Sequence, residues 1–106
     1  MKKRNIILIG MPGAGKSSVG VILAKALGYE FIDTDLVIQH REKRLLREII
    51  ADEGNEGFLA IENEVNATLE ADESVIAPGG SAIYGKEAME HFKEIGTIVN
   101  LDHRFP

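Results

Sequence analysis

The sequence contains no cysteine and no tryptophan, and only three of its 106 residues are proline. The lack of cysteine excludes disulfide bonds and every metal site built on thiolates. Aromatic residues make up 6% of the chain but apolar residues make up 44%, so we expect a core of aliphatic side chains. A chain of this length predicts one small domain, spanning residues 1–106.

Positive charge is also in short supply, since the formal net charge is −5 and the isoelectric point is about 5.1. A general nucleic-acid-binding protein usually carries a basic face, so we expect no nucleic-acid partner. No apolar stretch approaches the roughly 20 residues that a membrane span needs. The run Ile6–Ile9 follows a basic N-terminus but is too short for a signal peptide. We therefore expect a cytoplasmic protein with no membrane partner.

Short apolar runs alternate with segments whose apolar residues recur at helical spacing. This alternation indicates parallel strands joined by right-handed helical crossovers, an α/β fold with about four strands. The sequence stops just after a strand, so we expect the sheet to be incomplete. Strands are expected at residues 5–9, 29–32, 74–77 and 97–101, and helices at 19–27, 36–41, 45–52, 56–71 and 86–94.

Two glycines are predicted to end helices. Gly28 stands where a helix C-cap glycine belongs, and Gly54-Asn55 is expected to break the chain between two helices. The first helix is expected to be amphipathic. Its apolar residues at helical spacing are Val19, Ile22, Leu23, Ala26 and Leu27.

Residues 10–17 read GMPGAGKS, which matches the P-loop pattern G-x-x-x-x-G-K-[ST] between a predicted strand and a predicted helix. Glycines let successive backbone N–H groups point into one concavity that holds phosphate oxygens, and the helix N-terminus adds partial positive charge. The pattern therefore predicts ATP binding and a three-layer P-loop NTPase-type fold.

Each part of this loop has an expected role. Lys16 is expected to reach the β- and γ-phosphates and to act in catalysis, and the Ser17 hydroxyl is expected to ligate Mg²⁺. The residues predicted to bind the nucleotide are Gly13, Ala14, Gly15, Lys16, Ser17 and Ser18.

Asp33-Thr34-Asp35 follows the second predicted strand, at the sheet edge where ligands of open α/β folds gather. In the functional interpretation, Asp33 helps to hold Mg²⁺ through water. Asp35 hydrogen-bonds the acceptor hydroxyl and takes its proton during transfer. The alternative is helix capping, which suits both residue types, and one residue can do both.

Gly79-Gly80 follows the third predicted strand, and paired glycines there would let a substrate approach the backbone closely. Together with residues 10–18, Asp33-Thr34-Asp35 and EGNEGF at 53–58 with Glu62 beyond it, this pair resembles the shikimate kinase family along essentially the whole chain. The resemblance implies transfer of the γ-phosphoryl group of ATP to a hydroxyl of shikimate, with Mg²⁺. It also implies that Asp35, Gly79 and Gly80 bind the substrate.

The sequence departs from the family in three places. Leu59 stands where the family has an arginine that grips the substrate carboxylate, so Arg44 or Arg47 would have to substitute. Pro78 and Ser81 replace a threonine and a third glycine. The family's C-terminal lid and adenine-contacting part are not in this sequence, and lid closure normally excludes water and completes the catalytic site.

Smaller signals have ordinary interpretations. His40, His91 and His103 lack metal-site spacing and are expected on the surface. The charge run at 40–44 is expected to be solvated, with an anion-binding role as the alternative. Phe58 is expected in the core, and Glu62 either orients a substrate-side group or is exposed on its helix.

Three functions therefore compete. The leading hypothesis is an ATP- and Mg²⁺-dependent phosphotransferase acting on shikimate or a related small anionic hydroxylated acceptor. The second is a non-catalytic nucleotide-binding fragment, either monomeric or self-associated through its incomplete sheet. The third is another P-loop kinase, for gluconate or a nucleoside monophosphate.

Overall fold

The computed structural model describes residues 4–10 and 16–101, and only the backbone of residues 16 and 17. Four parallel strands form one sheet in the order β2-β3-β1-β4. The predicted four-stranded α/β fold is therefore confirmed. The elements are β1 (Asn5–Gly10), α1 (Lys16–Leu27), β2 (Glu30–Asp33), α2 (Thr34–Glu42), α3 (Leu46–Ala67), β3 (Ser74–Ala77), the 3-10 helix η1 (Gly80–Tyr84), α4 (Lys86–Ile95) and β4 (Gly96–Leu101).

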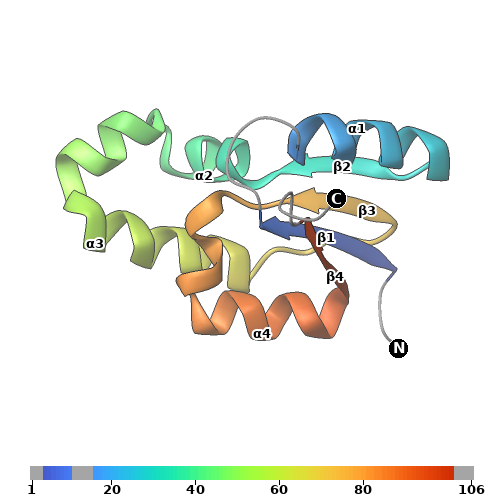
Figure 1. Cartoon of the computed structure of the whole chain (residues 1–106). Helices are drawn as coiled ribbons and strands as arrows, with labels where there is room; N and C mark the ends of the chain where they lie inside the picture. Colours follow the sequence, from blue (N-terminus) through green and yellow to red (C-terminus); the bar gives the residue numbers. More distant parts are fainter. Residues whose placement is uncertain (1–3, 11–15, 102–106) are drawn as a thin grey trace.

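Helices cover both faces of the sheet, with α1 on one side and α4 on the other (Figure 1). Successive residues of a strand point to opposite faces. Ile7 accordingly packs in the cluster that contains Phe92 of α4, whereas Leu8 packs in the cluster that contains Ala24 of α1. A third apolar cluster lies between α2 and α3 and is centred on Ile38, Ile49 and Val65.

Helix α1 ends in a Schellman motif at a left-handed glycine. Gly28 has φ +71°, and its N–H donates to the Lys25 carbonyl at 3.4 Å. The Tyr29 N–H donates to the Ala24 carbonyl at 2.8 Å. These two bonds satisfy carbonyls at the helix end that would otherwise lack donors, and they confirm the predicted C-cap.

The apolar face predicted for α1 is wrong except at Leu23, which packs against the cluster that contains Leu8 and Ala24. Val19, Ile22 and Leu27 are 44%, 69% and 47% exposed. Buried Gly20 and Ala24 approach the sheet instead. A Cβ on Gly20 would lie 2.5 Å from Phe31 Cε1, so the missing side chain allows α1 to lie close to β2.

Gly54 divides α3 into two helical halves. Its backbone, at φ +77° and ψ 174°, is not helical, which confirms the predicted break and requires glycine on steric grounds. Beyond the break, α3 turns back toward the sheet and packs against η1 and α4 (Figure 1). The turn predicted at Pro78-Gly79-Gly80 continues directly into η1.

In the described part of the chain, no helix is both long enough and apolar enough to cross a membrane.

Candidate functional site

The predicted site residues that follow β2 and β3 leave the sheet at the same edge. Both strands are parallel, and Asp33 at the end of β2 pairs in register with Ala77 at the end of β3. The segments that begin at Thr34 and Pro78 therefore start side by side. Strand β1 also ends at this edge, at Gly10, where the P-loop motif begins.

Asp33 caps helix α2. Its Oδ1 accepts the Asp35 N–H at 2.9 Å, which satisfies one of the free N–H groups at the helix start. The capping interpretation is thus confirmed for Asp33. A carboxylate has more than one acceptor lone pair, so this bond leaves capacity for a second contact.

Asp35 and Gly79 lie together, although 44 positions separate them. A Cβ built on Gly79 would lie 2.9 Å from Asp35 Oδ1 and 3.2 Å from Glu62 Oε2. Glycine at this position lets both carboxylates approach the backbone that follows β3. Gly80 comes next, opens η1 and is exposed.

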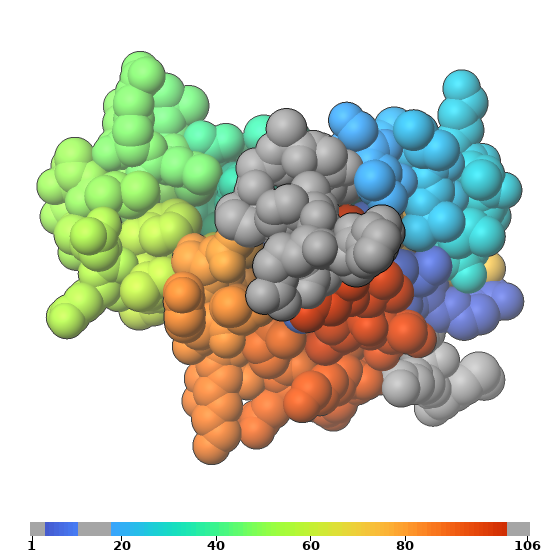
Figure 2. All heavy atoms as spheres, viewed as in Figure 1, coloured from blue at the N-terminus to red at the C-terminus, as the bar shows by residue number. Residues whose placement is uncertain are grey.

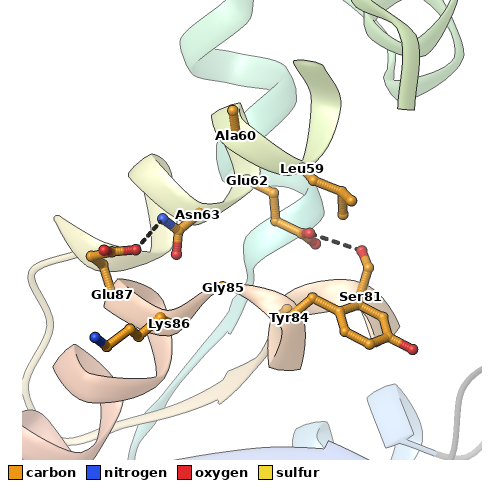
Figure 3. A pocket seen from close by; sticks show the side chains of 10 residues that line it. Leu59, Ala60, Glu62, Asn63, Ser81, Tyr84, Gly85, Lys86 and Glu87 are labelled. Carbon is orange, nitrogen blue, oxygen red and sulfur yellow. Dashed lines mark hydrogen bonds between the residues drawn. The ribbon is translucent and has the colours of Figure 1, made fainter. Parts of the chain in front are cut away.

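Glu62 is buried, with 2% of its surface exposed. Its Oε1 accepts a hydrogen bond of 2.8 Å from the Ser81 hydroxyl (Figure 3). The alternative of an exposed Glu62 is therefore wrong, and its role in orienting a substrate-side group stays a prediction. The contact joins α3 to η1, and no local sequence pattern could indicate it because 19 positions separate the two residues.

A cavity of about 290 Å³ opens between α3 and η1. Figure 2 shows that the yellow-green end of α3 and the orange segment of η1 and α4 form one continuous surface. In Figure 3, Leu59 and Glu62 extend from α3 on the side of Ser81. The residues that line the cavity are Leu59, Ala60, Glu62, Asn63, Ser81, Ala82, Tyr84, Gly85, Lys86 and Glu87.

Asn63 lines this cavity and joins α3 to the start of α4, a role that sequence reasoning missed. Its amide Nδ2 donates to Glu87 Oε1, and its Oδ1 accepts the Ala88 N–H, each at 2.9 Å. The donated bond holds the pKa of Glu87 below its ordinary value. Asn63 thereby fixes the start of α4 against α3.

Arg44 belongs to a different part of the molecule. It donates to Glu42 at 2.8 Å and to Asp52 at 3.0 Å, with Glu53 at 3.4 Å. These carboxylates raise the pKa of Arg44 above its ordinary value. Because the guanidinium already joins α2 to α3 through three acidic groups, the suggestion that Arg44 replaces the arginine missing at Leu59 is not supported.

The remaining predicted residues have mixed outcomes. Gly13, Ala14 and Gly15 lie outside the described residues, as do the side chains of Lys16 and Ser17, so their predicted roles stay predictions. Ser18 is exposed in the first turn of α1. Among the described residues, no group of three or more acidic, histidine or cysteine side chains could hold a metal ion.

The three histidines also differ. His40 is exposed, as expected. His91 is half-buried, and its Nε2 lies 2.6 Å from the Leu69 carbonyl oxygen, so its predicted surface position is wrong. His103 lies outside the described residues. Phe58 packs against the third apolar cluster, which confirms its predicted place in the core.

The family model described as shikimate kinase matches residues 12–106. A protein of Symbiobacterium thermophilum named shikimate kinase is 42% identical over 99 residues. The solved structure of shikimate kinase from Acinetobacter baumannii in complex with shikimate superposes with a TM-score of 0.83 at 36% identity and covers 93% of this chain. The solved structure of shikimate kinase from Bacteroides thetaiotaomicron superposes with a TM-score of 0.81 at 32% identity and also covers 93% of this chain.

These matches cover most of this chain but only part of each relative. The chain spans 57% of the Symbiobacterium protein, 56% of the Acinetobacter structure and 57% of the Bacteroides structure.

Proposed function

Because this chain belongs to the shikimate kinase family, we propose that it carries the phosphate- and acceptor-binding part of an ATP-dependent phosphotransferase. The acceptor is shikimate or a related small anionic molecule with a hydroxyl group. The observation that carries the proposal is the position of the Asp35 carboxylate against Gly79. Both residues follow strands that end at the edge where the P-loop motif starts.

In the proposed reaction, the acceptor hydroxyl hydrogen-bonds to Asp35. Its oxygen forms a bond to the γ-phosphorus while the bond from that phosphorus to the β–γ bridging oxygen breaks, and ADP leaves. Asp35 takes the hydroxyl proton. Lys16 and the backbone N–H groups of residues 13–18 hold the phosphates, which aligns the two reactants and neutralises charge.

Magnesium fits the residues proposed to hold it. Ser17 and Asp33 offer hard oxygen donors, and Mg²⁺ is usually held by one or two side chains together with phosphates and water. When bound, Mg²⁺ would neutralise charge on the β- and γ-phosphates. The cap bond from the Asp35 N–H uses only part of the acceptor capacity of Asp33.

The test measures the rate of phosphoryl transfer by the longest natural chain that contains this sequence. Shikimate is the acceptor, and the release of ADP reports the rate. Lys16→Ala and Asp35→Asn should each lower the rate to about 1% of the parent value or less. Glu70→Gln, which removes one exposed carboxylate in the connection between α3 and β3, should leave the rate unchanged. Full activity of Asp35→Asn would remove its proposed role.

The second candidate function is that residues 1–106 form one domain that binds nucleotide without catalysing transfer. ADP release by the 106-residue chain alone, with shikimate present, would exclude it. The gluconate and nucleoside-monophosphate alternatives predict transfer to those acceptors in the same assay and none to shikimate.

A further inference from the structure

We propose, building on the phosphotransferase function above, that Asn63 is a positioning residue for the acceptor. It clamps the end of η1 at Gly85, and η1 carries that constraint to the backbone of Gly79 and Gly80, which is proposed to bind the acceptor. Asn63 acts through η1 rather than on the acceptor itself. Binding of the acceptor, and not of the nucleotide, therefore depends on Asn63.

The first step is the cap that Asn63 supplies to α4 from another helix. Gly85 occupies the N-cap position of α4 and has no side chain that could accept a hydrogen bond from the helix start. Asn63 Oδ1 accepts the Ala88 N–H at 2.9 Å instead, and its Nδ2 donates to Glu87 Oε1 at 2.9 Å. Because a backbone N–H only donates and an ionised carboxylate only accepts, these two partners fix the orientation of the amide.

The second step is the fit between Asn63 and Gly85. A Cβ on Gly85 would overlap Asn63 Oδ1 and would lie 3.0 Å from its Cγ. The backbone of Gly85, at φ −90° and ψ 109°, has a conformation that other residues also adopt. The missing side chain at this position therefore serves the contact with Asn63 and not the shape of the backbone.

The third step is the path from Gly85 back to Gly79. The Ala82 N–H donates to the Gly79 carbonyl and the Gly85 N–H donates to the Ala82 carbonyl, each at 3.0 Å. The Met89 N–H then donates to the Gly85 carbonyl at 3.0 Å. One series of backbone hydrogen bonds thus joins the acceptor edge to the first turn of α4. Ala82 is 2% exposed, and a closely packed segment transmits a displacement rather than absorbing it.

The fourth step is that η1 is held at two points. Figure 3 shows Glu62 and Asn63, consecutive residues of α3, bonded to opposite ends of the segment 81–87. With one bond alone, the segment could still turn about that contact. The bonds of Asn63 remove this freedom, so their loss should displace Gly79 and Gly80 by a small distance without unfolding the chain.

The test measures the KM for shikimate and the KM for ATP in the longest natural chain that contains this sequence. Asn63→Ala should raise the KM for shikimate about fivefold, because a small displacement of a binding group is costly, and should change the KM for ATP by less than about twofold. The proposed ATP site at residues 10–18 lies outside the η1 segment. A general loss of folded protein would lower kcat and leave both KM values unchanged.

The matched control is Glu90→Ala, which truncates an exposed side chain on α4. It should change neither KM value.

Gly85→Ala tests the same contact without altering Asn63. Its methyl group should push the Asn63 amide away, so the KM for shikimate should again rise about fivefold. In the Asn63→Ala background the same substitution should raise this KM by less than about twofold, because the contact is already lost. Effects that multiply in the double variant would contradict a shared contact.

An exchange of donor and acceptor supplies the rescue. Asn63→Asp keeps an acceptor for the Ala88 N–H but turns a carboxylate toward Glu87, so the KM for shikimate should rise about fivefold here too. Adding Glu87→Gln provides an amide that can donate to this carboxylate. The double variant should therefore return to within about twofold of the parent KM, and no recovery would contradict the assigned pairing.

The outcomes separate the two proposals. If the parent chain transfers phosphate to shikimate but Asn63→Ala leaves the KM for shikimate unchanged, or raises both KM values alike, the positioning role is wrong and the phosphotransferase function stands. If the parent chain transfers nothing to shikimate, both proposals fail.

Discussion

Asn63 and Asn66 lie three residues apart on α3, and their side chains have opposite surroundings. Asn63 makes two hydrogen bonds that fix the start of α4. The amide of Asn66 is fully buried, and neither its nitrogen nor its oxygen has a hydrogen-bond partner in the described part of the chain. A buried amide without partners costs about 1–3 kcal/mol.

These surroundings predict opposite effects for the same substitution. Asn66→Leu should raise the free energy of unfolding by about 1 kcal/mol, because it removes an unsatisfied amide and keeps a similar volume. Asn63→Leu should lower it by about 1–2 kcal/mol, because the Ala88 N–H and Glu87 lose their partner. Urea unfolding of both variants measures the difference. A loss of stability in Asn66→Leu as large as in Asn63→Leu would contradict the assigned surroundings.

At the residue scale, the sequence carries signals only where the residues concerned are close together in the chain, and the chemical roles predicted from them stay predictions. The P-loop pattern, the pair Asp33 and Asp35, and the pair Gly79 and Gly80 each occupy a few consecutive positions. The contact between Ser81 and Glu62 could not be predicted, because it depends on the bend at Gly54 that returns α3 to η1. The same tertiary contact explains why an acidic residue on a helix became buried.

At the scale of elements, the strands were predicted well because central parallel strands read as continuous apolar runs. The face of α1 was predicted wrongly for a specific reason. Apolar spacing identified a helix, but the buried side is determined by Gly20 and Ala24, whose small size allows close approach to β2. Spacing of large apolar residues contains no signal for contact through a missing side chain.

The close approach at Gly20 gives a prediction for packing between α1 and β2. Gly20→Ala would gain about 1 kcal/mol of helix propensity. Its Cβ, however, would lie 2.5 Å from Phe31 Cε1 and 3.3 Å from Leu8 Cδ1, and such overpacking costs about 1–3 kcal/mol. We expect a net loss of about 1 kcal/mol in thermal or urea unfolding.

The control is a double-mutant cycle with Phe31→Leu, which withdraws the ring that the new methyl group would meet. Gly20→Ala should destabilise the Phe31→Leu variant less than it destabilises the parent chain. The coupling energy between the two substitutions should exceed about 0.5 kcal/mol. Equal effects in both backgrounds would show that Phe31 does not limit the distance between α1 and β2.

At the scale of the whole molecule, the described sheet has β2 and β4 at its edges. Apolar side chains are exposed on α1, among them Val19, Val21 and Ile22. Unpaired strand edges and exposed apolar residues favour association with other chains. The alternative of a self-associated chain predicts a species larger than one chain in sedimentation, and a compact monomer would count against it.

The whole-molecule architecture places three strand ends at one edge of the sheet. The P-loop motif, Asp35 and Gly79 all follow these strands, so nucleotide and acceptor would meet there. Family membership agrees with this arrangement. The central claim is that the backbone of residues 10–17 holds the phosphates of a nucleotide.

Calorimetric titration of the 106-residue chain with ADP and Mg²⁺ tests this claim most directly, with the Lys16→Ala variant measured beside it. We expect saturable binding with one site per chain in the parent, and affinity lowered at least about tenfold in the variant because a charge-assisted contact to phosphate is lost. No binding by the parent, or equal affinity in both chains, would contradict a phosphate site at residues 10–17.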